Sequence, residues 1–246
     1  MQLHVLGSGS ILSRGGRNPS GYIVKTETGQ LLVDCGPGIL RRIDEEGFDV
    51  MDFDGIILSH FHLDHCTDVL PLLMKRHLTT PGVNSDFFIA GSYGLRHWFD
   101  QMAGMQGDWL NAHLPELIDL SEHFIRWKGF DITCTYNGHT EDSIAIRFDG
   151  DRCLFYSSDT DFSSDLASFA AGAHLGIVEC SQAENNKVRG HMVPSETGRF
   201  AALAGFGHLV VTHLYPENEN PSLETQIARY FHGTITIAWD GFSTRV

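Results

Sequence analysis

The chain lacks the features that mark secreted and membrane-spanning proteins. No apolar run approaches the ~20 residues that a membrane span requires. The opening residues show no basic segment followed by a long apolar core, so no secretory signal is expected. The cysteines are odd in number and form no CxxC pair; the five are Cys35, Cys66, Cys134, Cys153 and Cys180. Scattered thiols of this kind indicate a reducing compartment. We therefore expect a cytoplasmic protein without a membrane partner.

Positive charge is also scarce. Lysine and arginine number 17 against 31 acidic residues, which gives a formal net charge of -14 at pH 7. Basic residues gather only at Arg41-Arg42, at Lys75-Arg76 and at 126–128. So acidic a chain repels a polyanion unless its basic side chains share one face. We expect no large nucleic acid as a partner, whereas a small phosphoester bound through metal ions is compatible with this charge.

The 246 residues contain no charge run, low-complexity segment or Pro/Gly-rich linker. A single domain that covers residues 1–246 is therefore expected. The run Gly7-Ser8-Gly9-Ser10 superficially resembles a phosphate-cradling loop, but the Lys and Ser/Thr of that loop do not follow it. We interpret it as a turn of small residues near the functional site.

Each half of the chain begins with strand patterns and continues with strands that alternate with helices. The first half has predicted strands at 3–6, 22–26, 31–33, 56–58 and 87–90, and predicted helices at 39–46, 64–78 and 93–103. The second half has predicted strands at 123–127, 130–136, 143–148, 152–157, 175–179, 208–212 and 234–238, and predicted helices at 164–170, 195–204 and 222–231. Two such halves predict an α/β fold in which two sheets pack face to face with helices outside.

Four metal-ligand residues fall within six positions, directly after the apolar residues 55–58; they are His60, His62, Asp64 and His65. On an extended backbone the spacing of His60 and His62 places both imidazoles on one side, and the next two side chains can face a second point. Imidazole and carboxylate form the ligand set of zinc and similar divalent metals. The run predicts a strand end that presents a pair of metal ions, and with it a hydrolase. A solvated histidine-rich loop is the alternative, since 14 residues of the chain are histidine.

Three later strands also end in ligand-type residues. His139 follows the predicted strand 131–136, Asp159 follows 153–156, and His213 follows 209–211. Active sites of α/β folds collect at the carboxyl ends of buried strands. These three side chains are therefore expected to complete the site that begins at 60–65.

In this order the motifs resemble the metallo-β-lactamase fold superfamily, and most closely its tRNase Z and phosphodiesterase branch. The resemblance rests on HxHxDH at 60–65, GHT at 138–140, SDT at 158–160 and TH at 212–213, together with Val33-Asp34-Cys35-Gly36. It implies a four-layer αββα sandwich. It also implies one metal on His60, His62 and His139, a second on Asp64, His65 and His213, and a bridge between them through Asp159. Zinc is the expected metal, with manganese and iron as alternatives. A bridging carboxylate brings two cations to roughly 3.5–4 Å, where a shared water becomes hydroxide near neutral pH.

The same resemblance assigns an acid. Glu179 matches the strand-end glutamate of the family, and Arg189-Gly190-His191 matches its later glycine–histidine motif, although Met192 stands where relatives carry a hydroxyl residue. His191 would protonate the departing oxygen, while Glu179 holds the ring charged and oriented. With Asp64, these two residues make up the expected catalytic set. The alternative is that His191 lies in a solvated loop.

A departure from tRNase Z decides the expected substrate. Those enzymes carry an inserted tRNA-binding arm between the positions equivalent to His139 and Asp159, whereas nineteen residues (140–158) separate them here. We therefore predict a dinuclear phosphodiesterase that acts on a small or cyclic phosphoester through a bridging hydroxide. The alternatives are a hydrolase of carboxyl esters, lactones or thioesters, a tRNA 3′-processing endoribonuclease, and a metal-binding member without catalysis. Relatives are often dimers, and the sequence leaves the choice between a monomer and a homodimer open.

Overall fold

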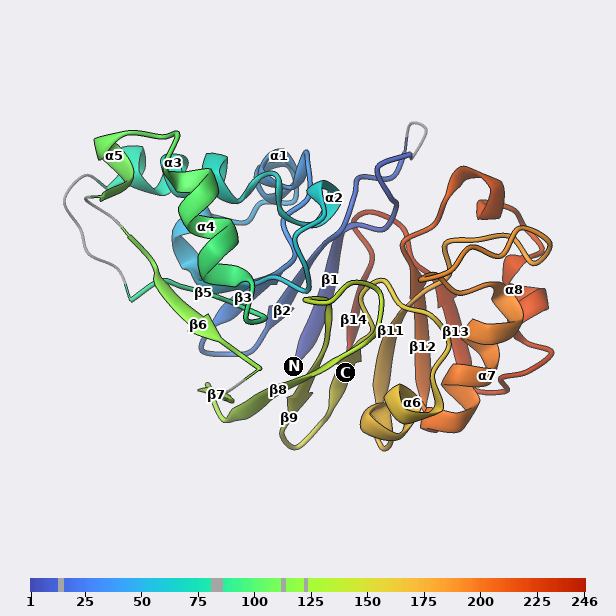
Figure 1. The fold of residues 1–246 in the computed structure, drawn as a ribbon. Helices are drawn as coiled ribbons and strands as arrows, with labels where there is room; N and C mark the ends of the chain where they lie inside the picture. The colour runs from blue at the N-terminus through green and yellow to red at the C-terminus, as the bar shows by residue number, and fades with distance from the viewer. Residues whose placement is uncertain (13–15, 81–85, 112–113, 122–123) are drawn as a thin grey trace.

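The computed structural model describes residues 1–12, 16–80, 86–111, 114–121 and 124–246 (Figure 1). The strands are β1 (Gln2–Gly7), β2 (Gly21–Lys25), β3 (Gln30–Val33), β4 (Phe53–Ile57), β5 (Phe88–Gly91), β6 (Glu116–Asp119), β7 (Ile125–Trp127), β8 (Phe130–Tyr136), β9 (Ile144–Asp149), β10 (Leu154–Tyr156), β11 (Leu175–Glu179), β12 (His208–Thr212), β13 (Thr234–Ile237) and β14 (Ser243–Arg245). The α-helices are α1 (Ile39–Glu45), α2 (Leu63–Cys66), α3 (Val69–Thr79), α4 (Leu95–Ala103), α5 (Asp108–Asn111), α6 (Ser164–Ala170), α7 (Pro194–Ala204) and α8 (Leu223–Ile227).

Two seven-stranded sheets follow the same plan. Their strand orders are β14-β1-β2-β3-β4-β5-β6 and β7-β8-β9-β10-β11-β12-β13. In the first sheet, three antiparallel pairings are followed by three parallel ones. The second sheet repeats this sequence of pairings. Parallel neighbours require a crossover, and the helices supply it, as α1 does between β3 and β4 and α7 between β11 and β12.

The inner faces of the two sheets share one core. Tyr22 and Val33 from the first sheet meet Ile146 and Tyr156 from the second, and each is at most 2% exposed. The outer face of the first sheet packs against α1, α3 and α4, and that of the second against α6, α7 and α8 (Figure 1). The predicted four-layer αββα sandwich is confirmed. Within the described residues, none of the helices is both long enough and apolar enough to span a membrane.

The helix predicted at 64–78 is in fact two helices, α2 and α3. The chain leaves α2 at Thr67, and the carboxylate of Asp68 accepts hydrogen bonds from the backbone N–H groups of Gly38 (2.9 Å) and Leu40 (3.0 Å). Asp68 thus satisfies donors at the start of α1, which helices leave without intrahelical partners. Pro71 is tolerated because it stands in the first turn of α3.

Other boundaries shift by a few residues. The helix predicted at 222–231 is shorter, at Leu223–Ile227, and strands β6 and β14 were not predicted. The strand predicted at 123–127 corresponds to β7, while residue 123 lies outside the described residues. The predicted strand ends nevertheless lie together, because the ligand-type residues that follow β4, β8, β10 and β12 are close to one another in space.

Candidate metal centre

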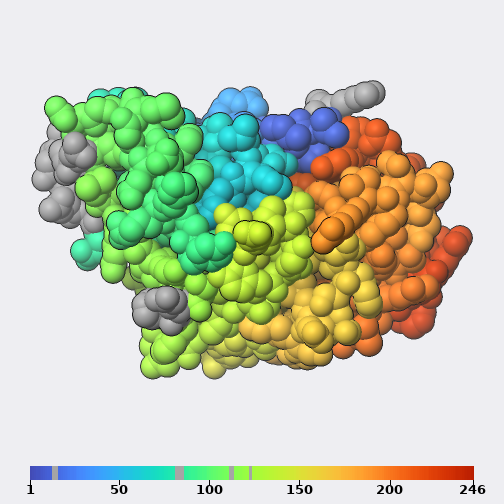
Figure 2. Space-filling view, in the orientation of Figure 1, coloured from blue at the N-terminus to red at the C-terminus, as the bar shows by residue number. Residues whose placement is uncertain are grey.

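The predicted ligands form two groups around Asp159. The ligand atoms of His60, His62, His139 and Asp159 all lie within 4.8 Å of one another, and Asp64, His65 and His213 form a second such group. In the space-filling view, segments from near residue 65 (teal), near 140 (yellow-green) and near 190 (orange) meet in the middle of one face (Figure 2). The structure therefore brings together all seven residues that the sequence placed at the metals.

The two oxygens of Asp159 face different histidines. Oδ2 lies 3.9 Å from Nε2 of His60 and 3.8 Å from Nε2 of His139. Oδ1 lies 3.4 Å from Nε2 of His65 and 3.3 Å from Nε2 of His213. Burial alone would raise the pKa of Asp159, but the neighbouring imidazoles hold it well below its usual value. This is the arrangement that a carboxylate needs to bridge two cations.

Several atoms of the centre have no hydrogen-bond partner. They are Nε2 of His65, Nε2 of His213 and Oδ1 of Asp159, and all three residues are at most 2% exposed. Buried polar atoms are nearly always paired, since leaving one without a partner costs free energy. Nitrogen and carboxylate oxygen atoms that converge without donors between them fit divalent cations such as zinc.

In four of the histidine rings, a hydrogen-bond partner of Nδ1 fixes the direction of Nε2. Nδ1 of His65 lies 2.7 Å from the carboxylate of Asp34, and Nδ1 of His139 lies 2.9 Å from the carbonyl oxygen of Gly190. Nδ1 of His60 and of His213 contact the hydroxyls of Ser59 (3.1 Å) and Ser181 (2.9 Å). Partners of this kind set the tautomer and the ring orientation of a metal-binding histidine. In all four rings Nε2 is left to face Asp159.

Asp34 has a role that the sequence did not reveal. It is fully buried at the end of β3, and its carboxylate accepts hydrogen bonds from Ser59 N–H (2.9 Å), Tyr156 O–H (2.7 Å) and Ser20 O–H (3.0 Å). It therefore ties the ring of His65 to both sheets. The available signal was its place in Val33-Asp34-Cys35-Gly36, another polar residue at a strand end.

The backbone is strained at the same place. Of the four non-glycine residues with positive φ in the described chain, three belong to this centre: Asp34 (56°), Ser158 (54°) and His213 (53°). Left-handed backbone costs of order 1–3 kcal/mol for such residues and is concentrated at functional sites. Here it turns the chain sharply at the ends of β3, β10 and β12.

Asp64 lies at the rim of the second group. Its Oδ2 is 3.4 Å from Nε2 of His213 and accepts a hydrogen bond from Ile11 N–H at 3.3 Å. Burial would raise the pKa of Asp64, yet the contacts with His213 and His65 lower it to about 2. The side chain is therefore an anion at neutral pH, as a metal ligand must be.

The predicted acid pair lies beside this group. Nδ1 of His191 is 2.9 Å from Oε1 of Glu179, and the ring of His191 stacks on that of His213 with 5.8 Å between centroids. Burial alone would lower the pKa of His191, but Glu179, Asp159 and Asp64 raise it to about 9. Glu179 is 1% exposed and also accepts hydrogen bonds from the N–H groups of Thr160 and Ser181. His191 itself is 9% exposed, which does not fit a solvated loop residue.

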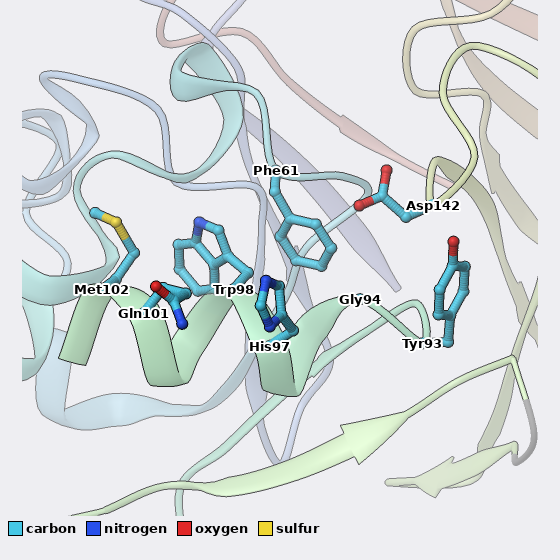
Figure 3. A pocket seen from close by; sticks show the side chains of 8 residues that line it. All are labelled: Phe61, Tyr93, Gly94, His97, Trp98, Gln101, Met102 and Asp142. Carbon is cyan, nitrogen blue, oxygen red and sulfur yellow. The ribbon is translucent and has the colours of Figure 1, made fainter. Parts of the chain in front are cut away.

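A groove of about 530 Å³ runs along α4 and reaches Phe61, between two candidate ligands in the sequence; it is lined by Phe61, Tyr93, Gly94, His97, Trp98, Gln101, Met102 and Asp142. Figure 3 shows His97, Trp98, Gln101 and Met102 along α4, with Phe61, Tyr93 and Asp142 on other segments beside it. Phe61 stands between His60 and His62 and stacks on Trp98 with 5.4 Å between centroids. A Cβ atom on Gly94 would come within 3.0 Å of both Phe61 and Asp142, so glycine keeps this part of the groove open.

Known proteins with similar sequence or structure agree with this picture. A probable metallo-hydrolase of Bacillus subtilis, YhfI, is 27% identical over 98% of this chain and 98% of its own. Its crystal structure, of a metallo-beta-lactamase fold protein, matches with a TM-score of 0.87 over 99% and 98% of the two chains at 25% identity.

Two more distant structures share the fold. Human tRNase Z, short form, has a TM-score of 0.79 at 19% identity and covers 100% of this chain and 99% of its own. A diphosphatase from the PhnP family has a TM-score of 0.75 at 19% identity over 100% and 97% of the two chains. The predicted resemblance to the metallo-β-lactamase superfamily is confirmed. The sequence model of the family described as Anti-Pycsar protein Apyc1 matches residues 1–192, so the chain belongs to that family and is a metallo-hydrolase with homologues of the YhfI and ribonuclease Z type.

Proposed function

We propose that the protein is a dinuclear phosphodiesterase that acts on a small or cyclic phosphoester. The observation that carries this proposal is the buried pair of His191 and Glu179, 2.9 Å apart, next to a carboxylate that faces two groups of histidines. An alkoxide is a poor leaving group, so cleavage of a phosphodiester profits from an acid placed at the site. Opening a lactone or a thioester has less need of one.

The residues that would hold the metals are those of the two groups around Asp159. When bound, two divalent cations supply an activated water and offset the charge that develops on the phosphoryl group. Glu179 binds Nδ1 of His191, so the proton for the departing oxygen comes from Nε2 of that ring. Asp34 and Ser181 keep the rings of His65 and His213 in place during this transfer.

The shape of the molecule favours a small substrate. Residues 140–158 are used up by β9, β10 and the turns beside them, so this stretch forms no arm that could hold a tRNA body. The net charge of -14 also opposes a long polyanion. Solved structures named for tRNase Z and for a PhnP-family diphosphatase share the fold, which agrees with chemistry at phosphorus.

The groove beside Phe61 offers space for the part of the substrate that does not react. Its volume of about 530 Å³ lies within the usual range for small-molecule pockets. Its walls are mainly apolar and include the rings of Phe61, Tyr93 and Trp98, which suits a planar ring. We place the non-reacting group of the phosphoester there.

A substrate panel at fixed metal content tests the proposal. The panel contains cyclic and linear alkyl phosphodiesters, a lactone and a thioester, with Asp159→Ala as the blank. We expect phosphodiesters to have the highest kcat/KM. Faster turnover of the lactone or the thioester would instead support the carboxyl-ester alternative.

A further inference from the structure

Residues 182–192 lie within the connection from β11 to α7 and contact both parts of the metal centre; we call them the 182–192 loop. The carbonyl oxygen of Gly190 lies 2.9 Å from Nδ1 of His139, a candidate ligand of the first group. The next residue, His191, stacks on His213 of the second group. The position of this one loop therefore decides the orientation of a metal ligand and of the acid.

The contact between Gly190 and His139 is demanding. Gly190 has a φ of +88°, and a Cβ atom there would lie 2.9 Å from Nδ1 of His139. The backbone can come this close only without a side chain. With a proton on Nδ1 donated to the Gly190 carbonyl, Nε2 of His139 keeps its lone pair for a metal.

Apolar burial does not hold the tip of this loop. Residues 184–189 are all exposed, and the one aliphatic residue among them, Val188, is 46% exposed. The position of the tip must therefore come from polar contacts. One is Glu184, whose carboxylate accepts hydrogen bonds from the N–H (2.9 Å) and the hydroxyl (2.6 Å) of Ser195.

Lys187 also holds the loop through polar contacts, and it makes three of them. Its Nζ lies 2.5 Å from Asp161, 2.5 Å from Glu196 and 2.6 Å from the carbonyl oxygen of His191. An ammonium group has three protons, and all three are used here. Asp161 also accepts the N–H of Gly190 at 2.8 Å, so the same carboxylate binds Lys187 and the residue that contacts His139.

We propose that Lys187 is a positioning residue: by tying the 182–192 loop to Asp161 and to Glu196, it sets the orientation of His139 and of His191. Exposed ion pairs contribute little to stability, with a median of about 0–1 kcal/mol. The loss of Lys187 should therefore leave the fold intact. Without Lys187, the carboxylates of Asp161 and Glu196 lose the cation between them. Asp161 would then no longer hold the backbone of Gly190 in its place. The part that concerns His191 rests on the proposed function; the part that concerns His139 does not.

Metal affinity tests the inference without any substrate. Zinc is titrated into metal-free protein against a chromophoric chelator for the wild type, Lys187→Met and Lys187→Arg. The matched control is Lys75→Met, because Lys75 forms an exposed ion pair with Asp44 on the helical layer of the first sheet. We expect Lys187→Met to weaken one of the two zinc sites by about 10–100-fold, the usual effect of losing an outer partner of a ligand. Lys187→Arg should restore most of this affinity, and Lys75→Met should match the wild type.

A second readout follows His139 directly. In metal-free protein with ¹⁵N-labelled histidine, the Nδ1–H signal of His139 should shift or broaden in Lys187→Met but not in Lys187→Arg or Lys75→Met. Asp161→Asn, which removes the charge that Lys187 binds, should act in the same direction and serves if Lys187→Met does not fold. Wild-type zinc affinity and an unchanged His139 signal in both variants would overturn the inference. So would an equal loss of affinity in Lys75→Met.

The kinetic arm separates this inference from the proposed function. With zinc saturating, Lys187→Met should lower kcat for an alkyl phosphodiester more than for a nitrophenyl diester, with KM little changed. An equal fall for both esters would contradict the part that concerns His191. A wild-type enzyme that cleaves no phosphodiester would count against the proposed function, while the zinc result would still decide the role of Lys187.

Discussion

Among the single residues of the centre, Asp159 stands apart because its two oxygens face histidines of different groups. Each histidine serves one group, whereas Asp159 serves both, with Oδ1 3.3 Å from His213 and Oδ2 3.8 Å from His139. Sequence alone pointed to Asp159 through its place at a strand end. For Asp34 it offered a place at a strand end but no role, since the partners of that carboxylate (Ser20, Ser59, His65 and Tyr156) come from separate segments that only the folded chain brings together.

The first prediction concerns metal content. The wild type should carry two divalent metals per chain, and Asp159→Ala should lose activity and most of the second metal, because the two oxygens of Asp159 face one group each. Elemental analysis of purified protein measures this, with the exposed Asp100→Ala on α4 as the control. One metal in the active wild type, or two in Asp159→Ala, would rule out a bridging role.

The second prediction concerns the acid. His191→Ala should reduce turnover of an alkyl phosphodiester by about 10²–10⁴-fold, the usual contribution of general acid catalysis. A nitrophenyl diester has a good leaving group and should lose much less. Glu179→Gln should show the same order more mildly, since Glu179 acts through His191. Metal content should stay unchanged in both variants. Equal losses on the two esters, or loss of a metal, would assign His191 a different role.

At the scale of helices and strands, the local sequence pattern predicted the elements whose ends form the site. It did not predict element boundaries that depend on a tertiary contact. The segments 130–136, 164–170, 175–179 and 208–212 were predicted with the bounds that β8, α6, β11 and β12 have. The break between α2 and α3 was not predicted, because it depends on Asp68 binding the start of α1. Strand β14 is short and polar at Ser243–Arg245, and only its pairing with β1 makes it a strand.

The third prediction concerns the groove along helix α4. If its groove takes a planar part of the substrate, Tyr93→Ala should raise KM for a phosphodiester that bears an aromatic ring and leave kcat nearly unchanged. A dimethyl-type phosphodiester should show no change. Met105→Ala is the control, since Met105 is 73% exposed beyond the end of α4 and does not line the groove. The same KM effect on both substrates would mean that the groove binds something other than the ring.

At the scale of the whole molecule, charge and shape bear on the choice of substrate. A net charge of -14 and the short stretch between His139 and Asp159 both oppose binding of a folded RNA. The fourth prediction is that precursor tRNA binds weakly and is cut poorly at physiological salt. Gel assays with a tRNA 3′-processing enzyme as the positive control measure this. Efficient cleavage at the tRNA 3′ end would refute the small-substrate proposal.

The candidate ligands come from both sheets. His60, His62, Asp64 and His65 follow β4 of the first sheet, whereas His139, Asp159 and His213 follow strands of the second. Cations held between them would join the two layers of the sandwich like a cross-link, so metal supply and resistance to unfolding become one linked equilibrium. At a hundredfold excess over Kd, each site adds about 2.7 kcal/mol, or roughly 5–10 °C in Tm for a chain of this size.

This linkage gives the fifth prediction. Chelation should lower Tm by several degrees, and zinc should restore it in proportion to the logarithm of its free concentration. Asp159→Ala should respond to zinc much less. If the chelator leaves the Tm of the wild type unchanged, metals do not contribute to holding the two sheets together. In the linked case, the lifetime of the folded protein in a cell would rise and fall with the metal that its chemistry needs.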